Sequence, residues 1–388
     1  NAVMQLDPVM VSVGYQQSFG FVQKVTAAGR NRMFNRMNQY YPGMLMQMNP
    51  GGQYLGQEPG DHRSMERLLA ELADEPVAAS PYLHPPVPGV LPPHGMATPH
   101  EVITAGGGVS NLWGEIFGGG QIQETTRLVK GWKNSSGGFA VGRDRLLPMY
   151  HALIGFSFGA GFDSARSEDK NNRAESEQMF FSFYGSKKWR NWLLTGSFGY
   201  SHAELESTRY ALNNGQARGI RNAGTWFGNL EAARRCELIH RRGGASYFEP
   251  YISWELISYE ENAFTESGNY IAMAFDRRNE STGLSTVGFR LGSLIPECWG
   301  LRCMKPELSF GWIHDFNGGP SQMTAKWAAG GSVPMLLYGT PRHGDRIAGG
   351  IKFEADVSRR LTMFFRYDGE YAKNYGGHYV SSGVNVMF

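Results

Sequence analysis

The sequence of 388 residues has no long apolar run, little net charge and few cysteines. A transmembrane helix needs about 18 or more consecutive apolar residues, and no segment provides them. The nearest segment, 146–162, is interrupted by Pro148, His151 and Ser157. The formal net charge of +2 gives no reason to expect a nucleic-acid partner. Three cysteines are too few for a disulfide scaffold, which excludes the small disulfide-rich class.

The start of the chain and its cysteines each allow two interpretations. Asn1 is preceded by neither Met nor a signal segment, so we expect a processed product or a piece cut from a longer precursor. Cys298 and Cys303 flank a short Trp-Gly segment and could form a disulfide in an oxidising compartment. Two free thiols in a turn are an equally good interpretation. Cys236 has no cysteine near it in the sequence.

Glycine and aromatic residues are abundant instead. The chain contains 51 glycines, and 13% of its residues are aromatic, whereas only 19% are charged. This composition favours many short strands joined by tight turns over helices.

The first 108 residues differ in character from the rest. Residues 1–41 are predicted to be helical, because apolar and small residues recur every three or four positions. The other positions of this helix carry Lys24, Arg30, Arg32 and Arg36. Residues 42–108 are predicted to be a Pro-rich linker with a short helix near 61–74. The linker histidines lack the spacing of metal ligands, so we predict neither a metal site nor a cofactor.

From about residue 109 the hydrophobic pattern changes to a period of two, which is typical of strands. In the run 344–358, for example, Ile351 and Phe353 share one face, whereas Lys352 and Glu354 share the other. Twelve strands are predicted, near 109–122, 135–147, 150–163, 176–187, 191–204, 223–236, 246–259, 281–293, 305–316, 344–358, 360–371 and 378–388.

The lengths of the connections distinguish a membrane barrel from a soluble one. Links such as 187–190 and 358–359 are short, whereas alternate links such as 207–223, 262–280 and 317–343 are long and polar. Short turns on one rim and long loops on the other are typical of outer-membrane barrels, which have an even number of strands. Residues 109–388 are therefore predicted to form an all-β, 12-stranded antiparallel transmembrane β-barrel in the lipid of a bacterial outer membrane. Aromatic residues near strand ends are predicted to form interfacial girdles, namely Trp132, Trp189, Trp192, Trp254, Trp312 and Phe316.

The chain ends on an alternating run in which Val384, Val386 and Phe388 face one way. In lipid every backbone polar group must be paired, so we expect this run to pair with 111–117 and close the barrel. Its pattern of polar, glycine, apolar and aromatic positions also looks like the signal read by the barrel-assembly machinery of the outer membrane. The positions of that assembly signal are Ser381, Gly383, Val386 and Phe388.

Short stretches in a fixed order carry a family resemblance. Residues 113–119 are similar to the first strand of the family, which opens with Trp and ends in Gly-Gly. Further similar stretches are Gly142-Arg143-Asp144, Leu230-Glu231-Ala232, Glu249-Pro250-Tyr251, 289–292 and 312–316. With Phe388 at the end, residues 109–388 resemble the translocator domain of a type V autotransporter.

The resemblance implies a function and a set of partners. A translocator domain inserts as a barrel and exports an upstream passenger to the cell surface. The barrel-assembly machinery and periplasmic chaperones would be its partners during biogenesis.

The resemblance also implies an α-helix, the tail of the passenger, threaded through the pore. About 70 residues separate Gln39 from the first strand, where the family has a short link. The helix in 1–41 is favoured as the pore helix over that in 61–74, because it is longer and basic.

The same alternation predicts which charged side chains face the lumen. An acidic lumen with low-dielectric walls would attract the basic residues of the pore helix. Alternatively, the lumen charges only solvate a water-filled pore. The predicted inward charges are Glu115, Glu231, Glu249, Glu255, Arg290, Glu354, Asp356, Arg366, Asp368 and Glu370, together with Glu307, Asp315 and Lys352.

Two other functions are compatible with an outer-membrane barrel. A barrel enzyme, such as a protease or lipase, would need a nucleophile and a base close together, and no Ser/His/Asp set has motif spacing, so no catalytic residue is predicted. A small-molecule porin is disfavoured by the threaded helix. Self-cleavage at an Asn, with Glu231 or Glu255 orienting the attack, is the remaining enzymatic alternative. We favour the alternative that Asn1 is the boundary of a piece cut from a longer sequence and not the product of self-cleavage.

Overall fold

The computed structural model describes residues 110–388 apart from short gaps. The gaps are 126–129, 148–149, 169–171, 190–191, 212–214, 242–243, 269, 271, 299, 331–332, 342–343 and 359. The predictions for the two N-terminal helices, the linker and the basic residues of the first helix therefore lie outside the described residues. Within the described ranges, no helix has the length and apolar character needed to cross a membrane.

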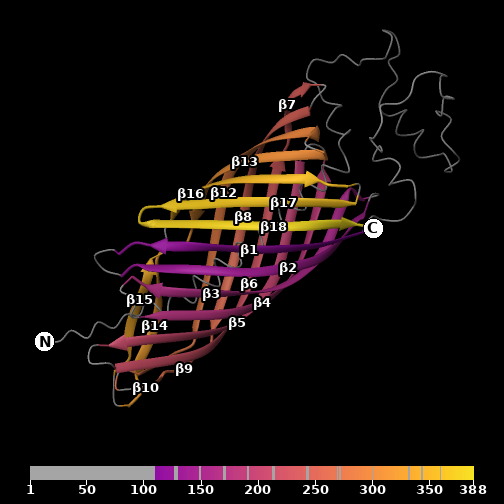
Figure 1. Ribbon diagram of the computed structural model, residues 1–388. Coiled ribbons are helices and arrows are strands. Elements are labelled where there is room, and N and C mark those ends of the chain that lie inside the picture. The colour runs from indigo at the N-terminus through magenta and orange to yellow at the C-terminus, as the bar shows by residue number, and fades with distance from the viewer. Residues whose placement is uncertain are drawn as a thin grey trace, which may run out of the picture. The chain divides into compact units, whose positions relative to one another are not determined.

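Twelve antiparallel strands form the wall of a closed barrel in the described part of the chain (Figure 1). Each wall strand pairs with the wall strands before and after it in the sequence, as predicted. The short strand β7 (Cys236–Arg241) follows β6 after Arg235 and also pairs with β8. The wall strands are β1 (Ser110–Gln123), β2 (Trp132–Leu147), β3 (Ala152–Ser167), β4 (Arg173–Trp189), β5 (Trp192–Ala211), β6 (Gly215–Arg234), β8 (Gly244–Glu261), β12 (Arg278–Cys298), β13 (Leu301–Asp315), β16 (Asp345–Asp356), β17 (Leu361–Ala372) and β18 (Tyr375–Met387).

The last strand closes the barrel against the first. The pairing of β1 with β18 runs without a register shift from Asn111 opposite Met387 to Gln123 opposite Tyr375. The two strands lie side by side in Figure 1. The backbone N–H of Phe388 donates to the carbonyl of Ser110 at 3.0 Å. This confirms the predicted closure, and it leaves no unpaired ladder edge at the seam, as lipid requires.

The alternation places apolar side chains on the outer surface. On β3 the exposed side chains include Phe156 and Phe158, whereas Ser157 between them is buried. The outward positions are apolar or glycine over 154–162 on β3 and over 224–232 on β6. Runs of this length match the roughly 9–11 residues that a tilted strand needs to cross the hydrocarbon core. We call these outward positions the apolar band.

Several wall strands are longer than the sequence pattern predicts. The segment 207–223, predicted to be a loop, is largely strand, because β5 continues to Ala211 and β6 begins at Gly215. On the inner face of this extension, Ala203, Leu205 and Tyr259 pack in a buried cluster, whereas most of the outward side chains are polar, with Ile220 as an exception. The wall therefore continues past the apolar band on the rim that carries the longer connections.

The two longest predicted loops also contain strands. They form a second, four-stranded sheet from β9 (Phe264–Thr265), β11 (Met273–Phe275), β14 (Pro320–Trp327) and β15 (Met335–Pro341), and β10 (Ser267–Gly268) pairs with β6. Met273, Phe275, Met323 and Ala325 form the buried core of this sheet. These segments had too few residues with period-two alternation to be predicted as strands, and their sheet depends on contacts between two distant loops.

The girdle prediction is wrong for one residue. Trp132 faces inward and is 2% exposed, because its position shares the inner face with Asn134 and Ser136. Trp189, Trp192 and other predicted girdle residues are exposed on the outer surface.

Candidate functional site

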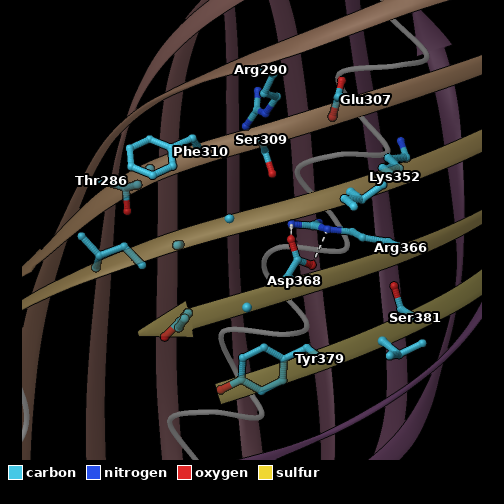
Figure 2. Close-up of a pocket in the computed structure, with 18 of the residues that line it drawn as sticks. Thr286, Arg290, Glu307, Ser309, Phe310, Lys352, Arg366, Asp368, Tyr379 and Ser381 are labelled. Carbon is cyan, nitrogen blue, oxygen red and sulfur yellow. Dashed lines mark hydrogen bonds and ion pairs between the residues drawn. The ribbon is translucent and has the colours of Figure 1, made fainter. Parts of the chain in front are cut away.

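The lumen is the candidate site, because the inner face of the wall gathers charged side chains. A cavity is lined by residues of β1, β8, β12, β13, β16, β17 and β18, and Figure 2 shows Arg290, Lys352 and Arg366 in it. Glu115 and Glu255 line the same cavity. The other predicted lumen charges also occupy inward-facing positions of the alternating strands.

Three sequence stretches that carried the family resemblance meet at Arg290. Its Nη1 donates to Glu249 Oε1 at 2.8 Å, and its Nη2 donates to both carboxylate oxygens of Glu231 at 2.9 Å. The guanidinium carbon lies 4.1 Å from the centre of the Tyr251 ring. Arg290 is directly opposite Glu249 in the pairing of β12 with β8. Charge-assisted hydrogen bonds of this kind are the strong ones, so this cluster joins β6, β8 and β12 firmly.

The Arg290 cluster extends toward β13 through Tyr247. Arg235 Nε donates to Glu249 Oε2 at 2.9 Å, and the Arg235 guanidinium carbon lies 3.6 Å from the centre of the Tyr247 ring. Tyr247 donates its hydroxyl to Glu307 Oε2 at 2.7 Å. A Cβ added at Gly292 would lie 2.2 Å from Tyr247 Cζ, so glycine is required there. The spacing of arginine and glycine in 289–292 thus has a packing reason.

A second ionic cluster lies where β16 approaches the short turn to β17. Lys305 Nζ is 2.9 Å from Glu354 Oε1 and 3.0 Å from Asp356 Oδ2. Lys352 Nζ is 3.0 Å from Glu354 Oε2, and Thr362 donates its hydroxyl to Asp356 at 2.8 Å. Every carboxylate in this cluster is paired with at least one cation.

Two further ion pairs involve predicted lumen residues of β17. Arg366 Nη2 donates to Asp368 Oδ1 at 2.8 Å, and Figure 2 shows this pair within the cavity. Arg346 Nη1 lies 3.4 Å from Glu370 Oε2, which is a longer contact.

The first-strand and second-strand stretches of the resemblance also pack together. Trp113 Nε1 donates to the Tyr184 hydroxyl at 2.6 Å, and Asn111 Nδ2 donates to Asp144 Oδ1 at 2.7 Å. A Cβ at Gly142 would lie 2.5 Å from Trp113 Cζ2. Gly142 therefore makes room for the indole, and Asp144 holds Asn111, which gives the Gly-x-Asp pattern a structural role.

Sequence reasoning missed several inward-facing cations. Arg221 Nε lies 3.0 Å from Glu261 Oε1, and Arg278 Nη2 lies 2.6 Å from Glu261 Oε2. Both arginines lie in segments that were predicted to be loops. Lys305 was overlooked although it lies two residues before Glu307 and so shares its face. These cations make the inner face less acidic than the predicted set of residues suggested.

The C-terminal signal residues divide between the two faces of β18. Ser381 lines the cavity (Figure 2), and a Cβ at Gly383 would lie 2.5 Å from the Gly114 carbonyl oxygen. Val386 lies opposite the lipid-facing Leu112, and the Phe388 side chain is 71% exposed.

Of the two interpretations of Cys298 and Cys303, the disulfide is not formed, because Cys303 has a free thiol. In the β12–β13 hairpin Cys303 lies opposite Pro296, whereas Cys298 lies opposite Leu301, so the two cysteines do not face each other. Among the described residues, no group of His, Cys, Asp and Glu could hold a metal ion.

Comparisons with known proteins give one family and one fold. A family model described as the autotransporter beta-domain matches residues 112–368. The translocator domain of the autotransporter NalP from Neisseria meningitidis is similar at 15% identity with a TM-score of 0.55, over 74% of this chain and 92% of that chain. The beta domain of the Bordetella autotransporter BrkA is similar at 14% identity with a TM-score of 0.55, over 72% and 100% of the two chains. No curated protein sequence matches this chain.

Proposed function

The chain belongs to the autotransporter beta-domain family and is an outer-membrane translocator domain for passenger export, and from this premise we propose that its lumen holds the basic helix in 1–41. The observation that supports the proposal is the placement of carboxylates on the cavity wall. Glu115 comes from β1 and Glu255 from β8, so the acidic groups lie on separate strands. A helix is about 10–12 Å across, and its cations would meet such groups in a low-dielectric setting.

Several acids of the inner wall are bound by cations of the wall itself. Glu231, Glu249 and Glu354 already accept charge-assisted hydrogen bonds from cations of the wall. They therefore stabilise the barrel itself. Glu115 and Glu255 line the cavity itself, and we propose that they contact Lys24, Arg30, Arg32 and Arg36.

Conductance in planar bilayers tests this proposal. Reversing Arg30 and Arg36 to Glu should raise the conductance, because the helix would be repelled from the acidic groups. The matched variant reverses Arg63 and Arg67, two cations in the segment 61–74, and should leave the conductance unchanged. The opposite result would assign the pore to the second helix, and no change in either variant would contradict a charge-held plug.

We further propose that the domain is not an enzyme. Self-cleavage would need a free carboxylate near the scissile Asn, yet both oxygens of Glu231 accept hydrogen bonds from Arg290. Mass spectrometry of the protein expressed with its upstream sequence tests this. A new N-terminus at Asn1 that disappears in Glu231→Gln or Glu255→Gln would refute the proposal.

Assembly is proposed to depend on the exposed C-terminal aromatic. Phe388 makes a backbone hydrogen bond to Ser110, but most of its side chain is exposed. It is therefore accessible to the barrel-assembly machinery, and periplasmic chaperones would keep the unfolded strands soluble beforehand.

A further inference from the structure

The outer face of β2 and β3 carries cations that oppose one another across the sheet. Lys133 on β2 lies directly opposite Arg166 on β3, and Arg166 lies directly opposite Arg173 on β4. All three side chains are exposed. Directly opposed residues have Cβ atoms about 5 Å apart, and like charges there destabilise the sheet. An anion bound between these cations would relieve their repulsion.

Only one of these three cations is neutralised by the wall. Arg173 forms an ion pair with Glu175 on its own strand. Lys133 and Arg166 form no ion pair with any of the residues that the structure describes. Two adjacent cations are thus left to solvent or to a ligand.

The next rung of the sheet toward the apolar band consists of hydroxyl groups. Ser135 lies directly opposite Ser164, and both face outward with the cations. Neither hydroxyl has a hydrogen-bond partner among the described residues. A hydroxyl can donate to a phosphate oxygen, so the two rungs together present four neighbouring side chains that can donate to one phosphate group.

Below the hydroxyls the surface becomes apolar and recessed. Gly137 lies opposite Phe162, and Phe139 lies opposite Ala160. A groove on this outer face is lined by Phe139, Ala160, Phe162 and Met179. On β1, Gly120 lies opposite Ser135 and adds no side chain to the outer face there.

The ladder has a definite position in the membrane. The turn from β2 to β3 is on the short-turn rim, which faces the periplasm in outer-membrane barrels. Lys133 and Arg166 lie at the other ends of these strands, beyond Phe162, where the apolar band stops. Arg166 lies four residue steps beyond Phe162, or about 13 Å along the strand. The cations therefore lie at the headgroup level of the outer leaflet.

We propose that this ladder is a binding site for a phosphorylated glycolipid of the outer leaflet. A sugar phosphate lies between Lys133 and Arg166 and accepts hydrogen bonds from Ser135 and Ser164. An acyl chain occupies the groove over Phe139 and Phe162. Charge-assisted hydrogen bonds to phosphate are strong, and the anion removes the like-charge repulsion of the empty site.

The acidic residues nearby fit this placement. Glu175 lies directly opposite Ser164, and Arg173 already binds its carboxylate. Glu168, two residues beyond Arg166, accepts a hydrogen bond from the Thr125 hydroxyl. Glu177 and Glu204 lie opposite each other between β4 and β5, on the far side of the groove from β2. The phosphate is therefore held on the β2–β3 side, away from Glu177 and Glu204.

Native mass spectrometry of the purified full chain in detergent tests the proposal, with bis-phosphorylated lipid A as the probe. The variant Lys133→Ser/Arg166→Ser should bind the probe at least tenfold more weakly than wild type. The matched variant Arg143→Ser/Arg145→Ser removes two exposed, outward-facing cations from the other end of β2 and should bind as wild type does. Dephosphorylated lipid A should bind wild type and the Lys133/Arg166 variant equally.

Three outcomes would overturn the proposal. They are unchanged binding in the Lys133/Arg166 variant, an equal loss in the Arg143/Arg145 variant, and equally tight binding of phosphatidylglycerol, which would indicate a general anion site. Without added lipid, the Lys133/Arg166 variant should unfold at the same denaturant concentration as wild type or higher. A marked loss of stability there would point to a structural role and also contradict the proposal. None of these results depends on what fills the pore.

Discussion

Replacing Arg290 with Met is expected to cost the barrel about 3–5 kcal/mol of stability, because it breaks a buried ionic cluster. Arg290 makes three hydrogen bonds to carboxylates, and the side chains of Glu231 and Glu249 are 1% and 0% exposed. Without the guanidinium, two buried carboxylates lose their shared cation. Arg235 still pairs with Glu249, so the larger part of the cost should arise at Glu231.

Denaturant titration of the folded barrel in detergent, followed by heat-modifiable gel migration, measures this loss. A double-mutant cycle with Glu231→Gln isolates the pair. Arg290→Met and Glu231→Gln together should cost less than the sum of the single changes, by about 1.5–3 kcal/mol.

The pair Arg366–Asp368 provides the matched control. It is also an arginine–carboxylate pair of the inner wall, but its side chains are 19% and 26% exposed and it involves one carboxylate. Arg366→Met should therefore cost about 1–2 kcal/mol. The reasoning fails if Arg290→Met costs no more than Arg366→Met, or if the cycle with Glu231→Gln is additive.

Three further predictions concern single side chains. Leu230 and Ile220 on β6 are equally exposed, at 54% and 53%, but only Leu230 lies in the apolar band. In lipid vesicles, Leu230→Arg should therefore lower the unfolding free energy by about 2–4 kcal/mol and Ile220→Arg by about 0–1 kcal/mol. Equal losses would show that the band is misplaced. Tyr247→Phe removes the hydrogen bond to Glu307 and should lower the unfolding free energy by about 1–3 kcal/mol, whereas Tyr210→Phe, at an exposed position, should change it little in the same titration. Deleting Phe388 should slow insertion into membranes that contain the assembly machinery but barely alter the stability of inserted barrel, because the side chain is exposed; an unchanged insertion rate would refute its role as a signal.

Much of the fold could be predicted from local sequence. The alternation of Ile351 and Phe353 with Lys352 and Glu354 identified both faces of β16, and the exposed and buried sides agree with it. A period of two is a property of the strand alone, since successive side chains point to opposite faces. The same reasoning predicted that β18 pairs with β1, because lipid permits no open sheet edge.

The sequence pattern was less informative where strands leave the lipid. There most outward positions become polar, so the contrast between the two faces weakens, and 207–223 was predicted to be a loop. The second sheet was not predicted either, because its core joins Met273 and Met323, which are far apart in the sequence.

By itself, then, the sequence determined the class of fold, the number of wall strands, their inward and outward faces and the closing pair, because each follows from alternation and from the need to pair every backbone group in lipid. Only the tertiary structure decided which inward charges meet. Glu231, Glu249 and Arg290 come from three strands, and their contact depends on the register between those strands. Register also separates Cys298 from Cys303 and sets Lys133 against Arg166. A shift of one residue in any strand would reverse its faces, so the contacts that define the lumen and the outer-face ladder exist only once the barrel has closed.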